Sequence, residues 1–266
     1  MPVLSIIACK MLEDELVHLL SVDGEVLELL LVDGRECLSL SGKLRAQNRS
    51  HLLLGLDKIA EHLKERQSST GGFFSSSSHR KATGLVVVVS PLRLGLHSDL
   101  ELLKAAVYDN IRRLAAFSDG MLIFYGKCGG ALADMEHDLS DLACPLYFLT
   151  DAQGKRIDDC IALALGGNEN YDLALAEHQD VALFMTPMWA SNWKAMGQED
   201  AASGKRRDLG AMLKGTDLRK VARIDSGLHF EKGFEEKVDD FAREFGLVRI
   251  ALPRGCLLYT SPSPRD

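Results

Sequence analysis

The sequence predicts a doubly wound α/β fold, in which helices cover both faces of a mostly parallel sheet. Short apolar runs without polar alternation recur along the chain, as is typical of strands that are buried on both faces. Between these runs lie segments whose apolar residues recur at helical spacing. Such an alternation of strands and helices favours a parallel sheet.

In the first half of the chain, buried strands are expected at 3–8, 25–32 and 84–89. A helix should follow the first strand. A long helix is predicted between residues 44 and 66, because apolar side chains there would share one face. The residues of that face are Leu52, Leu56, Ile59 and Leu63.

In the second half, Ser98 and Glu101 form a capping box that predicts the start of a helix. Its buried stripe is expected to comprise Leu100, Leu103, Val107, Ile111 and Leu114. Further strands are expected at 120–125, 144–150, 181–186 and 247–252, and the last of them should follow a helix. One face of that helix would carry Phe234, Val238, Phe241 and Phe245.

Residues 1–255 are expected to form a single α/β domain, with a flexible insertion rich in Ser and Gly at 67–83. Residues 256–266 resemble the translation of a transposon-end adapter used in sequencing libraries. We therefore expect this tail to be non-native and leave it out of the fold prediction. Native residues would then be missing after Gly255.

Composition limits the class of protein. A formal net charge of −7 argues against a nucleic-acid-binding surface, which needs a basic stripe. No apolar run approaches the ~18 residues of a membrane span, and the opening residues lack the charged region of a signal peptide. We expect a cytoplasmic protein whose cysteines are reduced.

Three cysteines follow predicted strands or begin a predicted helix. Cys9 comes directly after the first strand, Cys128 follows the strand at 120–125, and Cys160 lies where a helix is expected to start. In an open parallel sheet, ligands bind beyond the carboxyl ends of the strands. Three thiolates suit zinc with an open fourth position, or an iron–sulfur cluster. These cysteines are the candidate metal ligands.

The loop that holds Cys128 is rich in glycine. Gly126, Gly129 and Gly130 would let the backbone approach a bulky ligand or turn sharply around it, so they are candidate cofactor-binding residues. The loop does not match either common phosphate-binding glycine motif. A second reading makes the cysteines packing residues, because a buried cysteine often behaves as a small hydrophobe. Cys37 and Cys144 are assigned to this structural class.

Three more side chains are candidates for the site. His97 lies beyond the end of a predicted strand and could act as a fourth ligand or a proton carrier. Trp189 and Trp193 are four residues apart and would share a helix face, so that they could line a pocket for a substrate or cofactor. The sequence contains neither a nucleophile-elbow motif nor an HExxH motif.

The chain resembles the family called domain of unknown function 1638. The matching segments are "ACKMLEDEL", "GLHS", "YGKCG", "DDCIALALGG" and the Thr and Trp of "TPMW", which span most of residues 3–252. The resemblance points to Cys9, Cys128, Asp159 and Cys160. Asp158 and Met188 depart from the family pattern, which has His and Gly at these positions. The resemblance also implies a link to corrinoid-dependent methyl transfer.

Two functions follow as hypotheses. In the first, Cys9, Cys128 and Cys160 bind zinc or an iron–sulfur cluster, Asp159 orients a ligand or acts as a base, and a small-molecule substrate enters beside Trp189. Such an enzyme or accessory factor in one-carbon metabolism could have a corrinoid or methyltransferase protein as its partner. In the second, the protein binds a small molecule or anion without catalysis.

Overall fold

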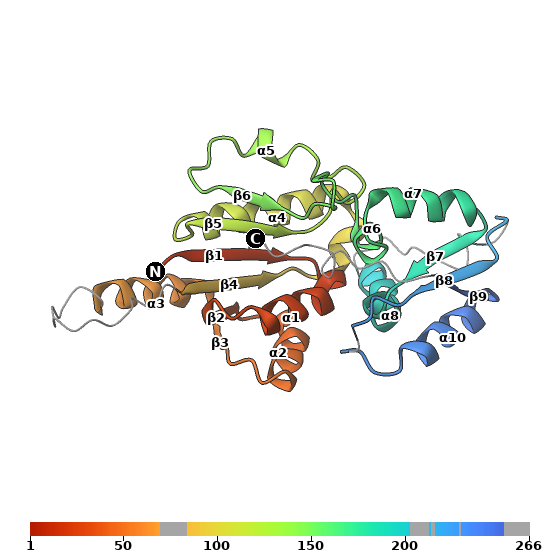
Figure 1. The fold of residues 1–266 in the computed structure, drawn as a ribbon, viewed down its shortest axis with the longest axis horizontal. Helices are drawn as coiled ribbons and strands as arrows, with labels where there is room; N and C mark the ends of the chain where they lie inside the picture. The colour runs from red at the N-terminus through yellow and green to blue at the C-terminus, as the bar shows by residue number, and fades with distance from the viewer. Residues whose placement is uncertain (70–83, 203–212, 214–215, 229, 253–266) are drawn as a thin grey trace.

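The computed structural model describes residues 1–69, 84–202, 213, 216–228 and 230–252. Two parallel sheets lie side by side, with helices around them (Figure 1). This arrangement confirms the predicted doubly wound α/β class. The predicted tail at 256–266 lies outside the described residues, as does the predicted insertion from residue 70 to residue 83.

The larger sheet has six strands in the order β3-β2-β4-β1-β5-β6, and every pair is parallel. The central strands are buried almost throughout, since helices cover both faces. The strands are β1 (Val3–Ala8), β2 (Val26–Val32), β3 (Leu52–Leu54), β4 (Leu85–Pro91), β5 (Gly120–Phe124) and β6 (Leu146–Phe148).

The helices of this part connect consecutive strands. Those packed against the sheet bury an apolar stripe, such as Leu103, Val107 and Ile111 of α4. The helices are α1 (Glu13–Val22), α2 (Cys37–Ala46), α3 (Leu56–Ser69), α4 (Leu100–Ala115) and α5 (Met135–Asp138), with the short 3₁₀ helices η1 (Lys10–Leu12) and η2 (Leu94–Ser98).

The smaller sheet has three parallel strands in the order β7-β8-β9. Its core contains an aromatic cluster in which the Trp193 ring lies 5.1 Å from Phe241 and 5.7 Å from Phe245. This part comprises α6 (Cys160–Ala164), α7 (Asn168–Glu177), β7 (Val181–Met185), α8 (Pro187–Ala202), β8 (Lys220–Ile224), α10 (Phe234–Phe245) and β9 (Val248–Leu252).

The predicted helix from 44 to 66 is wrong over its first half. Helix α2 ends before Asn48, whose φ of 56° is left-handed and breaks the helical path. Leu52 to Leu54 then pair with Leu30 to Val32 and form the edge strand β3. The apolar residues of the predicted helix therefore belong to two elements, strand β3 and helix α3. Three consecutive leucines are compatible with the periodicity of a strand and with that of a helix.

Two local predictions near η2 also need correction. The cap of α4 is Asp99, whose carboxylate accepts hydrogen bonds from the backbone N–H groups of Glu101 and Leu102 at 3.1 and 3.2 Å. The helix consequently starts one residue later than the proposed Ser98 capping box implies, and Leu100 is exposed rather than buried.

Strand β8 was not predicted at all, because charged residues interrupt its apolar pattern.

The connections of the larger sheet diverge at its centre. Strand β1 leads across β4 to β2, whereas β4 leads across β1 to β5 on the other side. The crevice between two such diverging connections is the usual ligand site of an open α/β sheet. In Figure 1 the carboxyl ends of these strands face α6 and α8 of the smaller part.

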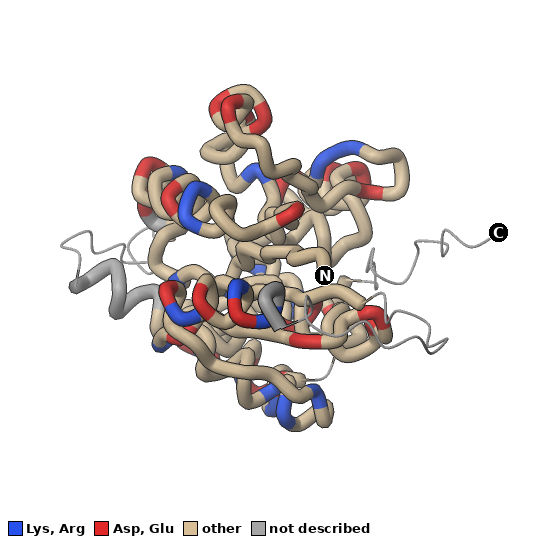
Figure 2. The backbone as a smooth tube through the Cα atoms, turned by 90° about the vertical axis from the view of Figure 1, so that its left-hand side faces the viewer, with Lys and Arg blue, Asp and Glu red and all other residues tan. Residues whose placement is uncertain are grey.

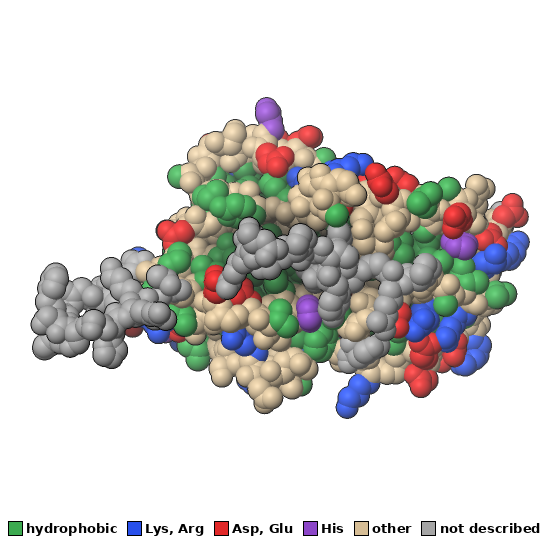
Figure 3. All heavy atoms as spheres, viewed as in Figure 1, with side chains coloured by type: hydrophobic (Ala, Val, Ile, Leu, Met, Phe, Trp, Pro, Cys, Tyr) green, Lys and Arg blue, Asp and Glu red, His purple; other side chains and the backbone are tan. Residues whose placement is uncertain are grey.

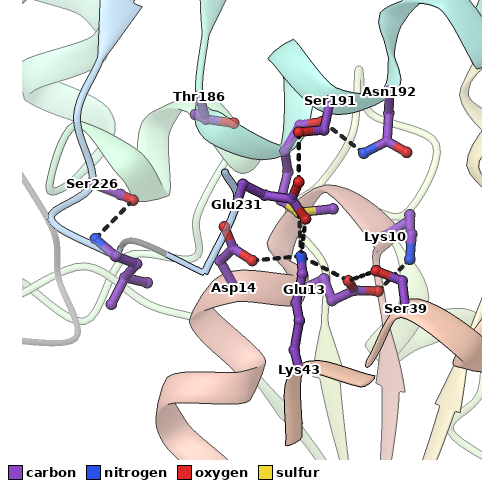
Figure 4. A network of polar contacts seen from close by, with 12 residues as sticks. Lys10, Glu13, Asp14, Ser39, Lys43, Thr186, Ser191, Asn192, Ser226 and Glu231 are labelled. Carbon is purple, nitrogen blue, oxygen red and sulfur yellow. Dashed lines mark hydrogen bonds and ion pairs between the residues drawn. The ribbon is translucent and has the colours of Figure 1, made fainter. Parts of the chain in front are cut away.

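A buried lysine connects the two parts (Figure 4). Lys43 Nζ lies 2.9 Å from Glu13 Oε1 and 2.7 Å from Asp14 Oδ1 on α1, and it also pairs with Glu231 beyond β8. Glu231 in turn accepts a hydrogen bond from Ser191 Oγ of α8 at 2.7 Å. Burial alone lowers the pKa of Lys43, but the carboxylates outweigh it and raise the pKa.

Glu15, on the same helix α1, is buried without an ion pair of its own among the described residues. Its Oε2 atom has no hydrogen-bond partner there. Burial raises the pKa of Glu15 to about 8. This carboxyl group is therefore mainly protonated at neutral pH, which avoids a further negative charge beside Asp14.

The surface carries charges of both signs. Lys and Arg alternate with Asp and Glu along the helices in Figure 2, and mixed groups lie over β8, β9 and α10 in Figure 3. There Arg249 pairs with Asp239 at 2.8 Å, and also with Glu235. Within the described part of the chain, every helix is too short or too polar to cross a bilayer.

The substitution Lys43→Met tests the buried ionic contact. Removal of the ammonium leaves three buried carboxylates without their shared partner, so the free energy of unfolding should fall by about 3–5 kcal/mol. Urea denaturation measures this change. The matched control, Lys58→Met on the exposed face of α3, should stay within about 0.5 kcal/mol of the wild type. Equal losses in both variants would show that Lys43 has no special role.

The substitution Glu15→Gln tests the buried carboxyl group. The pKa in the folded state is raised from 4.5 to about 8, so the wild type should lose stability as the pH rises between these values. Glutamine cannot ionise and removes that loss. The variant should match the wild type below pH 4.5 and exceed it above pH 8 by a few kcal/mol, as measured by denaturation at each pH. Parallel pH profiles for the two proteins would contradict this.

Candidate functional site

Cys9 is positioned by the end of the larger sheet. It follows β1 directly, and its backbone N–H donates to the carbonyl of Phe124 at the end of β5, at 3.1 Å. Its own carbonyl accepts from Leu12 N at 3.0 Å, which starts the turn of η1. The side chain is only 3% exposed. Cys9 is thus fixed at the edge where the carboxyl ends of β1 and β5 meet.

His97 reaches the same edge from η2, after β4. Its Nε2 lies 3.6 Å from Cys9 Sγ, and its Nδ1 lies 3.3 Å from the carbonyl oxygen of Leu94. If Nδ1 donates to this carbonyl, Nε2 is left free to accept a proton or bind a ligand. The ring also stacks on Tyr125, with centroids 6.1 Å apart. Burial is the largest single influence and lowers the pKa of His97, but the hydrogen bond and charge of Cys128, together with Leu94 and Asp159, raise the pKa overall.

The glycine-rich loop after β5 is held against the segment that precedes α6. Lys127 N donates to Ile157 O at 3.0 Å, and Cys128 N donates to Asp158 O at 2.8 Å. Cys128 has a left-handed backbone with a φ of 47°, and Gly129 continues this conformation at 65°. These hydrogen bonds bring Cys128 next to the Asp159–Cys160 pair.

Gly126 explains why this loop needs glycine. A Cβ atom there would lie 2.7 Å from the carbonyl oxygen of Asp158, and equally close to Cα and N of Asp159. No real Cβ contact is that short, so a side chain would push the two segments apart. Gly129 lines the cavity described below, whereas Gly130 faces open space and does not.

Asp159 and Cys160 begin helix α6. The Asp159 carboxylate caps the helix, since its Oδ1 accepts from Ile161 N at 2.8 Å and from Ala162 N at 2.9 Å. It also hydrogen-bonds the hydroxyl of Tyr171 on α7. Cys160 Sγ accepts from Trp189 Nε1 at 3.5 Å. The smaller part of the protein is therefore tied to the site through α6 and α8.

These residues surround one cavity of about 430 Å³ between the two sheets. The residues predicted from the sequence to form the site line it, with the exceptions of Gly130 and Trp193, so the predicted metal, catalytic and cofactor-binding residues lie together. Trp193 does not line it, because that ring packs in the core of the smaller part. Tyr171 and Phe184 also line the cavity, although they were not predicted from the sequence. No motif marked them, because β7 and α7 reach the cavity only through the packing of the two sheets.

The three thiols are protonated in this surrounding. Burial raises the pKa of Cys9 to about 12 and raises the pKa of Cys160 well above its ordinary value. Burial also raises the pKa of Cys128, although the hydrogen bond from His97 opposes this. The negative charge of Cys9 or Cys128 would raise the pKa of Cys160 further. A positive charge is needed before several of these thiols can ionise together.

The side chains that line the cavity include the types of donor that bind a soft metal, but their arrangement in the structure does not suit one. Three thiols and one imidazole are the ligands that zinc or an iron–sulfur cluster takes. Among the described residues, however, no three His, Cys, Asp or Glu side chains stand in positions that could hold a metal ion. Metal binding would therefore require these donors to rearrange.

Fold and site define an α/β protein with a thiol-lined cavity between two parallel sheets. Residues 91–257 match the profile of the family described as protein of unknown function (DUF1638), and the chain belongs to this family. The matched region includes His97, Cys128, Cys160 and Trp189. Neither the search of curated proteins nor the search of solved structures found a match to the chain.

The substitution Gly126→Ala tests the contact between the glycine loop and the α6 segment. The added methyl group must displace backbone atoms, so the free energy of unfolding should fall by about 1–3 kcal/mol. Cys128 should also react faster with a thiol reagent, because its loop would move away from Asp158. Gly34→Ala is the control, since nothing lies within 4 Å of a Cβ at that position. Unchanged stability and unchanged thiol reactivity in Gly126→Ala would contradict the close contact.

Proposed function

We propose that this protein binds zinc or an iron–sulfur cluster through Cys9, Cys128 and Cys160. The observation that supports this most directly is the convergence of the three thiols, which lie far apart along the chain, on one cavity. The charge of Cys9 raises the pKa values of Cys128 and Cys160, and the charge of Cys128 also raises the pKa of Cys160. His97 would serve as a fourth donor or as the proton carrier of the site.

The raised pKa values of the thiols support the need for a cation. A bound metal would supply the positive charge that the protein does not provide, and its binding would release the thiol protons. With three cysteine ligands, zinc keeps one position open for water, a thiol or a substrate. Asp159 lies at the same cavity and would orient that group or accept its proton.

The cavity supports a small-molecule substrate. Its volume of about 430 Å³ is within the usual range for such ligands. Trp189 is held in place by its hydrogen bond to Cys160, so the indole would form a fixed wall beside the metal. A role as an enzyme or accessory factor in methyl transfer, with a corrinoid or methyltransferase protein as partner, rests on the family resemblance alone.

A second function has an observation in its favour. The donors among the described residues do not stand in a metal-binding arrangement, and desolvation raises the pKa of each thiol, which disfavours the thiolate form. Both features also suit a non-catalytic small-molecule-binding protein whose cysteines are packing residues. The two functions differ in whether the purified protein contains a metal.

Metal analysis of anaerobically purified protein distinguishes the two functions. We expect about one zinc per chain, or iron together with sulfide, and we expect the substitution Cys128→Ser to lose most of it. Cys144→Ser is the matched control, because Cys144 does not line the cavity and should leave the metal content unchanged. A wild-type protein without metal and with freely titrating thiols would reject metal binding in favour of the second function.

A further inference from the structure

The cavity lining is poor in groups that can carry a positive charge. Among the residues that the structure describes, no lysine or arginine lines it. Lys10 and Lys127, which are next to lining residues in the sequence, pair with Glu13 and Asp158. Arg156 does not line the cavity, and its guanidinium stacks on Phe148 at 3.9 Å. Of the described residues that line the cavity, only His97 can become positive, and it is engaged by Cys9 and Leu94.

Within the described part of the chain, Asp159 is the one carboxylate that lines the cavity. Its oxygens accept hydrogen bonds from the first turn of α6 and from Tyr171, and none of the ion pairs found in the described part of the chain involves it. An anion placed beside Asp159 would be desolvated and would be repelled by the carboxylate. A cation there would gain an ionic partner in a place that is shielded from water.

Part of the cavity lining, next to Cys160, is aromatic and apolar. The Tyr171 and Phe184 rings meet edge to face at 5.8 Å, and Trp189 is oriented by its hydrogen bond to Cys160. Leu183 and Val181 of β7 fill the space beside them. Such ring faces attract a cation whose charge lies within an apolar shell, and Trp binds it best.

A metal would not change this charge character. Zinc carries two positive charges and three cysteine thiolates carry three negative charges, so the loaded centre would have a net negative charge. Asp159 would add a further negative charge. With or without the metal, the cavity disfavours an anionic ligand.

From these observations we infer that the cavity binds a small organic cation with an apolar surface, such as an alkylated ammonium, through the Asp159 carboxylate and the rings of Tyr171, Phe184 and Trp189. The inference excludes the anion that the sequence left open as a ligand. It depends on the cavity as a ligand site and not on the presence of a metal.

Three probes of equal shape test this inference by calorimetry. Choline carries the cation, 3,3-dimethylbutan-1-ol replaces its nitrogen with carbon, and 3,3-dimethylbutanoate carries a negative charge. We expect choline to bind at least about tenfold more tightly than the alcohol, and the carboxylate to bind most weakly. The titrations are made with metal-free protein and repeated with metal-loaded protein.

Two neighbouring carboxylates provide matched variants. Asp159→Asn removes the charge but keeps a good helix cap, so the fold should persist, which a melting curve verifies. It should reduce choline binding to the level of the alcohol. Asp158→Asn removes an adjacent carboxylate that pairs with Lys127 outside the cavity, and it should leave choline binding unchanged.

Several results would overturn the inference. These are equal binding of choline and the alcohol, tighter binding of the carboxylate, no binding of any probe, or equal effects of Asp159→Asn and Asp158→Asn. None of them bears on the proposed metal, which is decided by the metal content of the wild type and of Cys128→Ser.

Discussion

The parallel register of β1 with its two neighbours is the constraint on which the site depends. Ala8 pairs with Pro91 of β4 on one side and with Phe124 of β5 on the other. The three strands therefore end at the same level, and the residues that follow them meet at one edge. The connection after β1 and the connection after β4 run to opposite sides of the sheet. A crevice therefore remains between them at this edge, and side chains can line it. Cys9, His97 and Cys128 meet for this reason.

The second sheet completes the site, and its attachment requires buried charge. Lys43 holds carboxylates from α1 and from the segment after β8 in one contact, while Glu15 avoids a further charge by remaining protonated. Such contacts contribute little net stability, since desolvation offsets most of the attraction, but they fix geometry because few other arrangements satisfy them. The contact lies next to the cavity, as Met188 touches Lys43 and precedes Trp189. The distance between the two walls of the cavity thus depends on polar contacts as well as on apolar packing.

The cavity combines groups that can become negative with little that is positive. Three thiols and a carboxylate line it, and burial keeps the thiols protonated when nothing neutralises them. This accounts for the two proposals together. A metal bound by the cysteines would permit thiolates, and an organic cation beside the aromatic rings would pair with Asp159. Both would supply positive charge, for which His97 is the one source among the described lining residues.

The sequence by itself determined the class of fold and most of the site. Continuous apolar runs such as Val86 to Val89 identify buried parallel strands, and the cysteines that follow such runs could be assigned to one edge because parallel strands share a direction. Only the tertiary structure decided which sheet each strand joins, that Leu52 to Leu54 form a strand, and that Tyr171 and Phe184 reach the cysteines. The reason is physical. Periodicity is a local property of the chain, whereas strand pairing and the docking of two sheets are contacts between distant residues that no short pattern records.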